Sequence, residues 1–305
     1  MNKKLLFALF FLFIVPTIPA QTNGKVFLSL KKINKGKGHV PKTMNISSNW
    51  KFHEGDSAGW NLPSYNDSAW QIKNTDINID SLSPKQNTGI CWFRLKIVTD
   101  SSLFGKDLAL LIKQHGASEI FLDGRLVKKI GRVGSNLQDE EVNNPAEVPF
   151  AVNFDSSKTH LLAIRYSYMH VRELYGKFGQ IASMAGLHVS AGLLNAAVAN
   201  YNKMIREDAS LNFSLFGIVC ALAILHLLLF FFYKSRVDNL YYSIFSFSLS
   251  SNFLMGILNL FISDQTVLII IRIFLIIVIV LIFISFLAFI YSMRKFEESE
   301  KEKML

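Results

Sequence analysis

The sequence predicts a protein in two parts, a β-sandwich or jelly roll followed by an all-α segment that spans a membrane. Three observations support this fold class. Apolar and polar residues alternate with a period of two between residues 49 and 190, which is typical of strands with one buried face. Three long apolar stretches follow residue 210. The first 20 residues have the layout of a secretory signal peptide.

The composition narrows the class of protein further. Half of the 305 residues are hydrophobic and only 18% are charged, which excludes intrinsic disorder. The 32 basic and 23 acidic residues give a formal net charge of +9, whose meaning depends on where the charges lie relative to the membrane. Two cysteines, Cys91 and Cys220, are too few for a disulfide framework or a zinc ribbon.

The N-terminal segment, residues 1–20, predicts export of the domain that follows. Lys3 and Lys4 precede an unbroken apolar run over residues 5–15, and Ala20 closes the segment. An uncleaved membrane anchor is the alternative to a cleaved signal peptide. Both place the next part of the chain outside the cytoplasm.

Residues 21–44 are predicted to form a flexible basic arm. Six lysines lie in this segment among glycines and asparagines, a composition typical of a solvated arm. As an alternative, the arm contacts anionic polymers of the cell envelope. Nucleic acid is not an expected partner, because the segment is exported.

Residues 45–190 predict the sandwich itself. Phe93, Leu95 and Ile97 alternate with basic residues, so we expect one face of this strand to be buried. An Asp-Gly pair at position 123 separates two short strand patterns and predicts a hairpin. No window in this region shows helical periodicity. The same alternation recurs at Val148, Phe150, Val152 and Phe154 and at Leu162, Ile164, Tyr166 and Tyr168.

Several short motifs give this region a more specific resemblance. They are Trp50-Lys51-Phe52, Gly55-Asp56 with Trp60, Tyr65 to Trp70, Gly89 to Arg94, the hairpin at 117–127 and the strand at 161–168. In this order they resemble the galactose-binding-like jelly roll of family 2 glycoside hydrolases. A hydrolase of that family also needs a barrel with two glutamates beside the scissile bond. Apolar stretches follow here instead, so we expect no enzymatic activity from this chain.

Three apolar stretches predict membrane-spanning helices, since each is long enough to cross the hydrocarbon layer and only helices satisfy their own backbone there. Lys234 and Arg236 lie between the first two stretches, and Arg294 and Lys295 follow the third. Basic loops stay cytoplasmic, so we predict a multi-pass protein of the inner (cytoplasmic) membrane with its N-terminal domain outside. The predicted spans are residues 211–233, 240–262 and 267–293.

Two segments flank these spans. Residues 191–210 are predicted to be a helical linker, because their apolar residues recur at helical spacing. Residues 294–305 form a cytoplasmic tail rich in charged helix formers. This tail resembles the start of a coiled coil, and a solvated tail is the equal alternative.

A jelly roll followed by a membrane bundle resembles the bacterial seven-transmembrane receptors with diverse intracellular signalling modules. The resemblance implies an outer domain that senses a ligand, carbohydrate being the candidate, and an effector such as a histidine kinase. This chain departs from the pattern, with three spans and no effector. We therefore expect either a truncated relative of these receptors or a short form, a sensor module that works with itself or with a partner transmembrane signalling protein. The alternative is a membrane-anchored carbohydrate-binding or adhesion module without signalling.

Candidate ligand-binding residues lie at strand ends and in the loop expected after the last long strand, where sandwich scaffolds carry binding residues. Trp60, Trp70 and Trp92 suit stacking on sugar rings, although the resemblance favours a packing role. Arg94 points away from the buried face, toward a ligand or a neighbouring loop. The candidates are Arg94, His115, Arg165, His170, Arg172 and Tyr175.

The histidines and glycines predict no metal or cofactor site. The seven histidines show neither HxH nor HxxxH spacing, and no glycine-rich phosphate motif precedes a helix. Within the second span, small and amide residues fall on one helical face, which suits close packing in lipid. These helix-packing candidates are Ser248, Asn252, Gly256 and Asn259.

Overall fold

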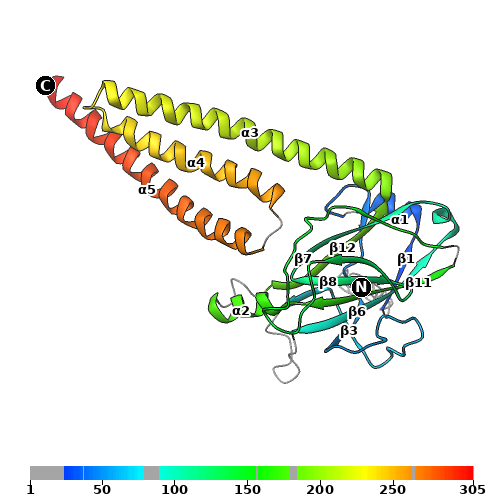
Figure 1. The fold of residues 1–305 in the computed structure, drawn as a ribbon. Coiled ribbons are helices and arrows are strands. Elements are labelled where there is room, and N and C mark those ends of the chain that lie inside the picture. Colours follow the sequence, from blue (N-terminus) through cyan, green and yellow to red (C-terminus); the bar gives the residue numbers. More distant parts are fainter. Residues whose placement is uncertain are drawn as a thin grey trace, which may run out of the picture.

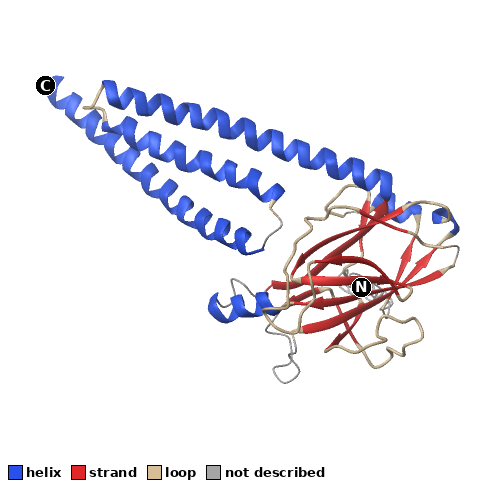
Figure 2. Cartoon of the chain, viewed as in Figure 1, coloured by secondary structure: helices blue, strands red, loops and turns tan. Residues whose placement is uncertain are grey.

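The computed structural model describes residues 24–36, 38–78, 89–155, 157–178, 184–262 and 265–304. Figure 1 shows a β-domain followed by three long helices, and Figure 2 shows that nearly all strands belong to the first part. The predicted signal peptide, residues 1–20, lies outside the described residues.

One sheet of the β-domain has seven strands in the order β4-β3-β6-β11-β8-β9, with β1 also paired to β6. All of its pairs are antiparallel except that between β1 and β6. We call it sheet A. Its strands are β1 (Lys25–Leu28), β3 (Trp50–Glu54), β4 (Gln71–Lys73), β6 (Ile90–Thr99), β8 (Ala117–Leu122), β9 (Arg125–Ile130) and β11 (Thr159–Ser167).

The second sheet, sheet B, has five antiparallel strands in the order β10-β7-β12-β2, with β5 also paired to β12. A short 3-10 turn, η2 (Ser101–Leu103), lies between β6 and β7. The strands of sheet B are β2 (Thr43–Asn45), β5 (Asp76–Asn78), β7 (Leu108–His115), β10 (Phe150–Val152) and β12 (Met184–Leu193).

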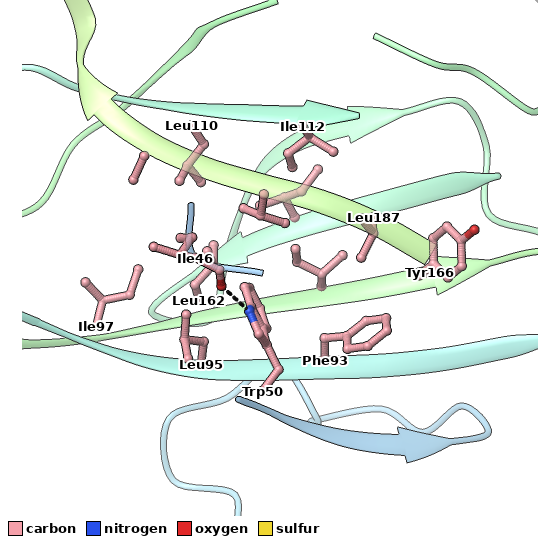
Figure 3. Packing of buried hydrophobic residues seen from close by; sticks show 14 of the residues in the cluster. Ile46, Trp50, Phe93, Leu95, Ile97, Leu110, Ile112, Leu162, Tyr166 and Leu187 are labelled. Carbon is pink, nitrogen blue, oxygen red and sulfur yellow. Dashed lines mark hydrogen bonds between the residues drawn. The ribbon is translucent and has the colours of Figure 1, made fainter. Parts of the chain in front are cut away.

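The main core lies between the two sheets and confirms the predicted sandwich. Phe93, Leu95 and Ile97 of β6 are fully buried, as their alternation predicts. They belong to one cluster with Leu110 and Leu187 of sheet B (Figure 3). Packing of apolar faces from both sheets is the main stabilising contribution in such a fold.

The hairpin between β8 and β9 also follows the prediction. Asp123 and Gly124 both have positive φ, 50° and 84°. A two-residue turn of type I′ requires this conformation at both central positions, which explains the Asp-Gly pair.

The predicted flexible arm is wrong for most of residues 21–44. Part of this segment forms β1, which pairs in parallel with β6, and part forms helix α1 (Leu30–Lys35). Leu28, Ile33 and Val40 are buried, while most of the lysines between them are exposed. The segment is thus an edge of the sandwich, ordered by a few apolar side chains that follow no single period.

The prediction of a loop after the last long strand is also wrong in part. Helix α2 (Met169–Phe178) follows β11 directly. The buried carboxylate of Glu140 accepts hydrogen bonds from the backbone N–H groups of Met169 and His170, at 3.2 and 2.8 Å. A carboxylate from a distant loop therefore caps this helix, and such a cap leaves no local sequence signal.

Three helices make up the rest of the chain: α3 (Leu194–Phe232), α4 (Val237–Phe261) and α5 (Gln265–Met304). Within the described chain, α3 and the stretch Ile273–Phe296 of α5 could cross a membrane by length and composition. Most of their apolar side chains face outward. The predicted span 240–262 coincides with α4, and its membrane crossing stays a prediction.

The boundaries of these helices differ from the predicted linker and tail. The first residues of the 191–210 linker complete β12, and the remainder is the beginning of α3 without a break. The 294–305 tail continues α5 as helix through Met304. Helix α4 packs between α3 and α5 (Figure 1).

Candidate functional site

Arg94 has the second of the two contacts predicted for it, that with a neighbouring loop. Its side chain is only 1% exposed, and its Nε donates to Asp67 Oδ2 at 2.8 Å. The other guanidinium nitrogens donate to carbonyl oxygens of Trp60, Leu62 and Tyr65. Arg94 therefore holds the loop between β3 and β4 against the outer face of sheet A.

Beneath that loop lies a small aromatic cluster, separate from the main core. Trp70 and Trp92 are 5% and 4% exposed, and Trp60 and Phe121 pack against them. The rings of Trp92 and Phe121 are stacked, with centroids 5.6 Å apart. This is the packing role that the resemblance favours for the tryptophans, in a second apolar layer on the outside of sheet A.

A hollow of about 390 Å³ lies at the edge of this cluster. We call it the sheet-A pocket. Asp56 and Arg165 form one wall, and a loop that follows β9 forms the other. Its main polar lining residues are Asp56, Arg132, Ser135, Asp139 and Arg165.

The wall of the sheet-A pocket is a fixed network of ion pairs. Arg165 donates to both carboxylate oxygens of Asp56, at 2.9 and 2.6 Å, and to Glu119 at 3.1 Å. The indole Nε1 of Trp92 donates to Asp56 Oδ1 at 2.9 Å. Because its donors hold it from two sides, the Asp56 carboxylate is preorganised and connects the pocket to the aromatic cluster.

The electrostatics of the network favour its charged form. Burial by itself raises the pKa of Asp56, but the hydrogen bonds from Arg165 and Trp92 and the charge of Arg165 outweigh it, so the pKa lies below its ordinary value. The pKa of Arg165 is raised, mainly by its hydrogen bonds to Asp56, against the effect of burial. Asp56 and Arg165 are therefore ionised at neutral pH.

A second hollow, of about 280 Å³, lies on the outer face of sheet B. We call it the sheet-B pocket. His115 and His188 line it from the sheet, and His39 and Glu147 line it from two loops. No sequence motif predicted this grouping, because the four residues come from segments far apart in the chain.

The six predicted ligand-binding residues do not form one site. Arg165 lies in the sheet-A pocket and His115 in the sheet-B pocket. His170 lies on α2, where its Nδ1 pairs with Glu140 at 2.8 Å, and Arg172 is exposed on the same helix. Tyr175 also falls in α2, and its side chain lies outside the described part of the structure.

Sequence reasoning missed Asp56 and Arg132 as pocket residues. Asp56 belongs to the Gly55-Asp56 motif, which indicated fold and gave no hint of a pairing 109 residues away. Arg132 follows the β9 strand, where a charged loop residue is unremarkable. A pocket assembled from three segments needs the tertiary structure to become visible.

Within the helices, Gly256 of α4 lies close to α3. An added Cβ at Gly256 would lie 2.9 Å from Asn212 Oδ1 of α3. Ser248 and Asn252 are half-buried, and the side chain of Asn259 lies outside the described residues. In the described part of α4, the fully buried small residues are instead Ser243, Ser246 and Ser250.

The first of these serines joins two helices directly. Ser243 Oγ donates to the carbonyl oxygen of Ala223 on α3, at 2.9 Å. The three serines are spaced by three and four residues, so the rule that selected the predicted stripe also fits them. Ser246 and Ser250 precede Ser248 and Asn252 by two residues, about 200° around an α-helix, so these serines lie on a different face.

No family model matches this sequence, and no curated protein matches it. Among solved structures, a calcium-binding mutant of Bacteroides uniformis β-glucuronidase 2 is 16% identical, with a TM-score of 0.36 over 49% of this chain and 18% of that protein. A Bacteroides vulgatus β-glycosidase is 21% identical, with a TM-score of 0.36 over 49% and 20%. A Faecalibacterium prausnitzii β-glucuronidase is 11% identical, with a TM-score of 0.34 over 50% and 31%. The chain spans less than a third of each of these proteins.

Proposed function

We propose that this protein is a membrane-anchored receptor module, whose β-domain binds a neutral carbohydrate outside the cell and passes the bound state to the helices. The sheet-A pocket is the proposed binding site. The proposed role is recognition and not catalysis. An effector such as a histidine kinase would receive this state from the helices.

The charges of the sheet-A pocket support a neutral ligand. Its two arginines, Arg132 and Arg165, are both paired with carboxylates, at 3.2 Å from Glu141 and 2.6 Å from Asp56. An anionic ligand would compete with these carboxylates for the two guanidinium groups. A sugar can instead add hydrogen bonds to the free lone pairs and backbone groups of the rim, as in many small-molecule sites.

The observation that carries the receptor proposal is the way that α3 leaves the β-domain. Strand β12 ends at Leu193 and α3 begins at Leu194, whose N–H donates to the carbonyl oxygen of Asp107 at 2.9 Å. Ala197 of α3 is fully buried against Ala109 and Leu111 on the outer face of sheet B. A rigid junction of this kind transmits a shift in the sheet, whereas a passive anchor needs only a flexible tether.

The arrangement of the helices supports the proposed orientation. The β-domain lies at one end of the bundle and the C-terminus at the other (Figure 1). Three crossings would place these two ends on opposite sides of a membrane. With basic residues at the α3–α4 turn and after the last span, the β-domain would face outward and the C-terminus inward, in the inner membrane.

Binding is tested with the full chain in detergent micelles. A panel of neutral monosaccharides and oligosaccharides is added, with uronic acids and amino sugars as charged comparisons, and the thermal midpoint is measured. A ligand at ten times its Kd stabilises the folded form by about 1.4 kcal/mol. Ser135→Tyr fills the pocket and should abolish the shift, while Ser157→Tyr, on an exposed loop elsewhere, should retain it. A panel without any shift contradicts the proposed function.

Coupling is tested separately from binding. Asn200 Nδ2 of α3 donates to the carbonyl oxygen of Pro41 at 2.9 Å, so cysteines at these two positions report on the junction. In a Cys220→Ala background, a bound sugar should change the yield of the disulfide between them. Binding with an unchanged yield would favour the passive carbohydrate-binding module. Replacing Asn252 and Asn259 by Leu should then leave every measured property of binding intact.

A further inference from the structure

In the sheet-B pocket, the imidazole of His188 lies between a carboxylate and a side-chain amide. Nδ1 of His188, on β12, lies 3.1 Å from Oε1 of Glu147. Its Nε2 lies 2.9 Å from Nδ2 of Asn45, at the end of β2. The Glu147 side chain is only 5% exposed, while that of His188 is 29% exposed and accessible to protons from solvent.

The orientation of the Asn45 amide determines which nitrogen of His188 carries the proton. Asn45 Oδ1 accepts a hydrogen bond from the backbone N–H of Ser47 at 2.8 Å, so the Nδ2 group must face the imidazole. An amide NH₂ only donates, and His188 Nε2 must therefore be an unprotonated acceptor. The proton of the neutral ring is on Nδ1, which donates to Glu147.

Proton uptake by His188 creates a conflict in this geometry. The new Nε2–H would point at the Nδ2 donor of Asn45. Two donors cannot share a hydrogen bond, and a rotation of the amide by half a turn resolves the conflict by presenting Oδ1 to the imidazolium. The same rotation places Nδ2 against the N–H of Ser47 and breaks that hydrogen bond.

The surroundings of His188 favour its protonated form. The hydrogen bond to Glu147 raises the pKa of His188 above its ordinary value, burial opposes this, and the charges of Glu147 and Asp76 add to the increase. Lys113 of β7 acts in the opposite direction. The other charged and titratable groups near Glu147 or lining the pocket are His39, 3.9 Å from Glu147, His115 of β7 and Tyr201 of α3.

We propose that His188 and Asn45 form a proton-sensitive switch, in which protonation of His188 rotates the Asn45 amide and releases Ser47. The switch does not depend on the proposed carbohydrate site. Only its effect on the helices rests on the proposed coupling between β-domain and bundle.

The segment that contains Asn45 and Ser47 reaches α3, so the switch has a route to the helices. Ser47 Oγ accepts from the backbone N–H of Val189 at 2.8 Å, which holds the segment to β12. Farther along, Val40 packs with Ala197, and the Pro41 carbonyl accepts from Asn200. Greater mobility of residues 40–47 therefore weakens one set of contacts between the β-domain and the start of α3.

The switch is tested by NMR on the full chain in detergent micelles, with labelled histidine, asparagine and serine. The His188 ring signals are assigned with His188→Gln and titrated from pH 5 to pH 9. The Asn45 side-chain amide and the Ser47 backbone amide should shift with the same midpoint as His188. Signals of Asn45 and Ser47 that stay constant through that midpoint would overturn the proposal, and this measurement needs no variant.

Two substitutions move the midpoint in opposite directions. In Asn45→Asp, the carboxylate can accept hydrogen bonds from the imidazolium and from the Ser47 N–H at once. The midpoint of the His188 titration should therefore move to higher pH, and the pH-dependent change in the Ser47 amide signal should vanish. Glu147→Gln removes the attracting charge, and the midpoint should move to lower pH. His53→Gln, on sheet A, is the control and should leave it unchanged. An unchanged or lowered midpoint in Asn45→Asp contradicts the switch.

The effect of the switch on the contacts between residues 40–47 and α3 is measured by limited proteolysis. Lys42 is an exposed residue within the 40–47 segment, and Lys106 is exposed in the turn before β7. The ratio of trypsin cleavage at Lys42 to that at Lys106 corrects for the pH dependence of the protease. This ratio should rise as His188 is protonated in the wild type and stay constant in His188→Gln. If the cleavage ratio stays constant with pH while the NMR signals of Asn45 and Ser47 follow His188, the switch exists but does not affect α3.

Discussion

The hydroxyl oxygen of Tyr166 accepts a hydrogen bond of 2.8 Å from the backbone N–H of Gly186, and so joins sheet A to sheet B inside the sandwich. The same hydroxyl donates to the carbonyl oxygen of His115 on β7. Tyr166 follows Arg165 of the sheet-A pocket, while Gly186 lies in the strand that leads into α3. This bridge therefore links the strand that carries Arg165 to the strand that leads into α3.

Replacing Tyr166 by Phe should lower the free energy of unfolding by about 1–3 kcal/mol, because a buried N–H and a buried carbonyl lose their partner. Burial raises the pKa of the Tyr166 hydroxyl well above its ordinary value, so the group remains a donor at any working pH. Thermal unfolding of the full chain in micelles measures the loss. Tyr65→Phe, at a ring that is 37% exposed, is the control and should cost little. Equal losses in the two variants would contradict the bridging role.

Gly186→Ala should be among the most damaging small substitutions in the β-domain. Gly186 has φ of +98°, and an added Cβ would lie 2.1 Å from the Thr75 carbonyl oxygen. The methyl group would push β5 away from β12, so we expect a loss of about 2–4 kcal/mol. Gly105→Ala is a matched control, since Gly105 also has positive φ but nothing within 4 Å of the added carbon. It should cost only about 1 kcal/mol. If the thermal midpoints of the two variants fall equally, the loss of stability comes from backbone strain at positive φ and not from the contact with Thr75.

The sequence was sufficient to predict those features that depend on neighbours along the chain. The alternation around Phe93 predicted the buried face of β6, and Asp123-Gly124 predicted the turn between β8 and β9, because each depends on local geometry. A neighbouring loop was one of the two contacts predicted for Arg94, but its partner was not predictable, because Asp67 lies 27 residues away in an irregular loop. The arm around Ile33 was missed because a few apolar residues among lysines are enough to order an edge once a sheet is present.

Arg94→Met should open the loop that covers the aromatic cluster. The substitution leaves the Asp67 carboxylate and three backbone carbonyls without their cation, and breaking a buried pair in this way costs about 3–5 kcal/mol. Tryptophan fluorescence should shift to longer wavelength as Trp70 and Trp92 become exposed. Arg125→Met, at an exposed position of β9, should change neither fluorescence nor stability. An unchanged spectrum in Arg94→Met would mean that the loop is held by its aromatic packing alone.

The pair of Asp56 and Arg165 should make the sheet-A pocket sensitive to acid. Because the pKa of Asp56 is lowered in the folded protein, its contribution to stability is complete above the ordinary pKa of about 3.9 and disappears as the pH falls through the lowered value. Asp56→Asn should cost about 0.5–1 kcal/mol at pH 7, a small value because the pair is partly exposed. The difference in thermal midpoint between wild type and Asp56→Asn should shrink toward zero near pH 2.

The control for this pH series is Asp208→Asn, at an exposed position of α3. Its difference from the wild type should be small at both ends of the range. A difference between wild type and Asp56→Asn that stays constant down to pH 2 would show that the Asp56 charge contributes nothing to the fold.

Gly256→Leu should separate α3 from α4. The added Cβ alone would lie 2.9 Å from Asn212 Oδ1, and the rest of the leucine has no space between the two helices. Overpacking of this kind costs about 1–3 kcal/mol, because close approach through small residues is what holds helices together in lipid. Gly217→Leu, on α3, is the matched control, since nothing lies within 4 Å of its added Cβ. Unfolding of both variants in mixed micelles with increasing SDS measures the difference. If the two leucines prove equally harmless, the contact between Gly256 and Asn212 does not hold the bundle, and the buried serines of α4 must do so.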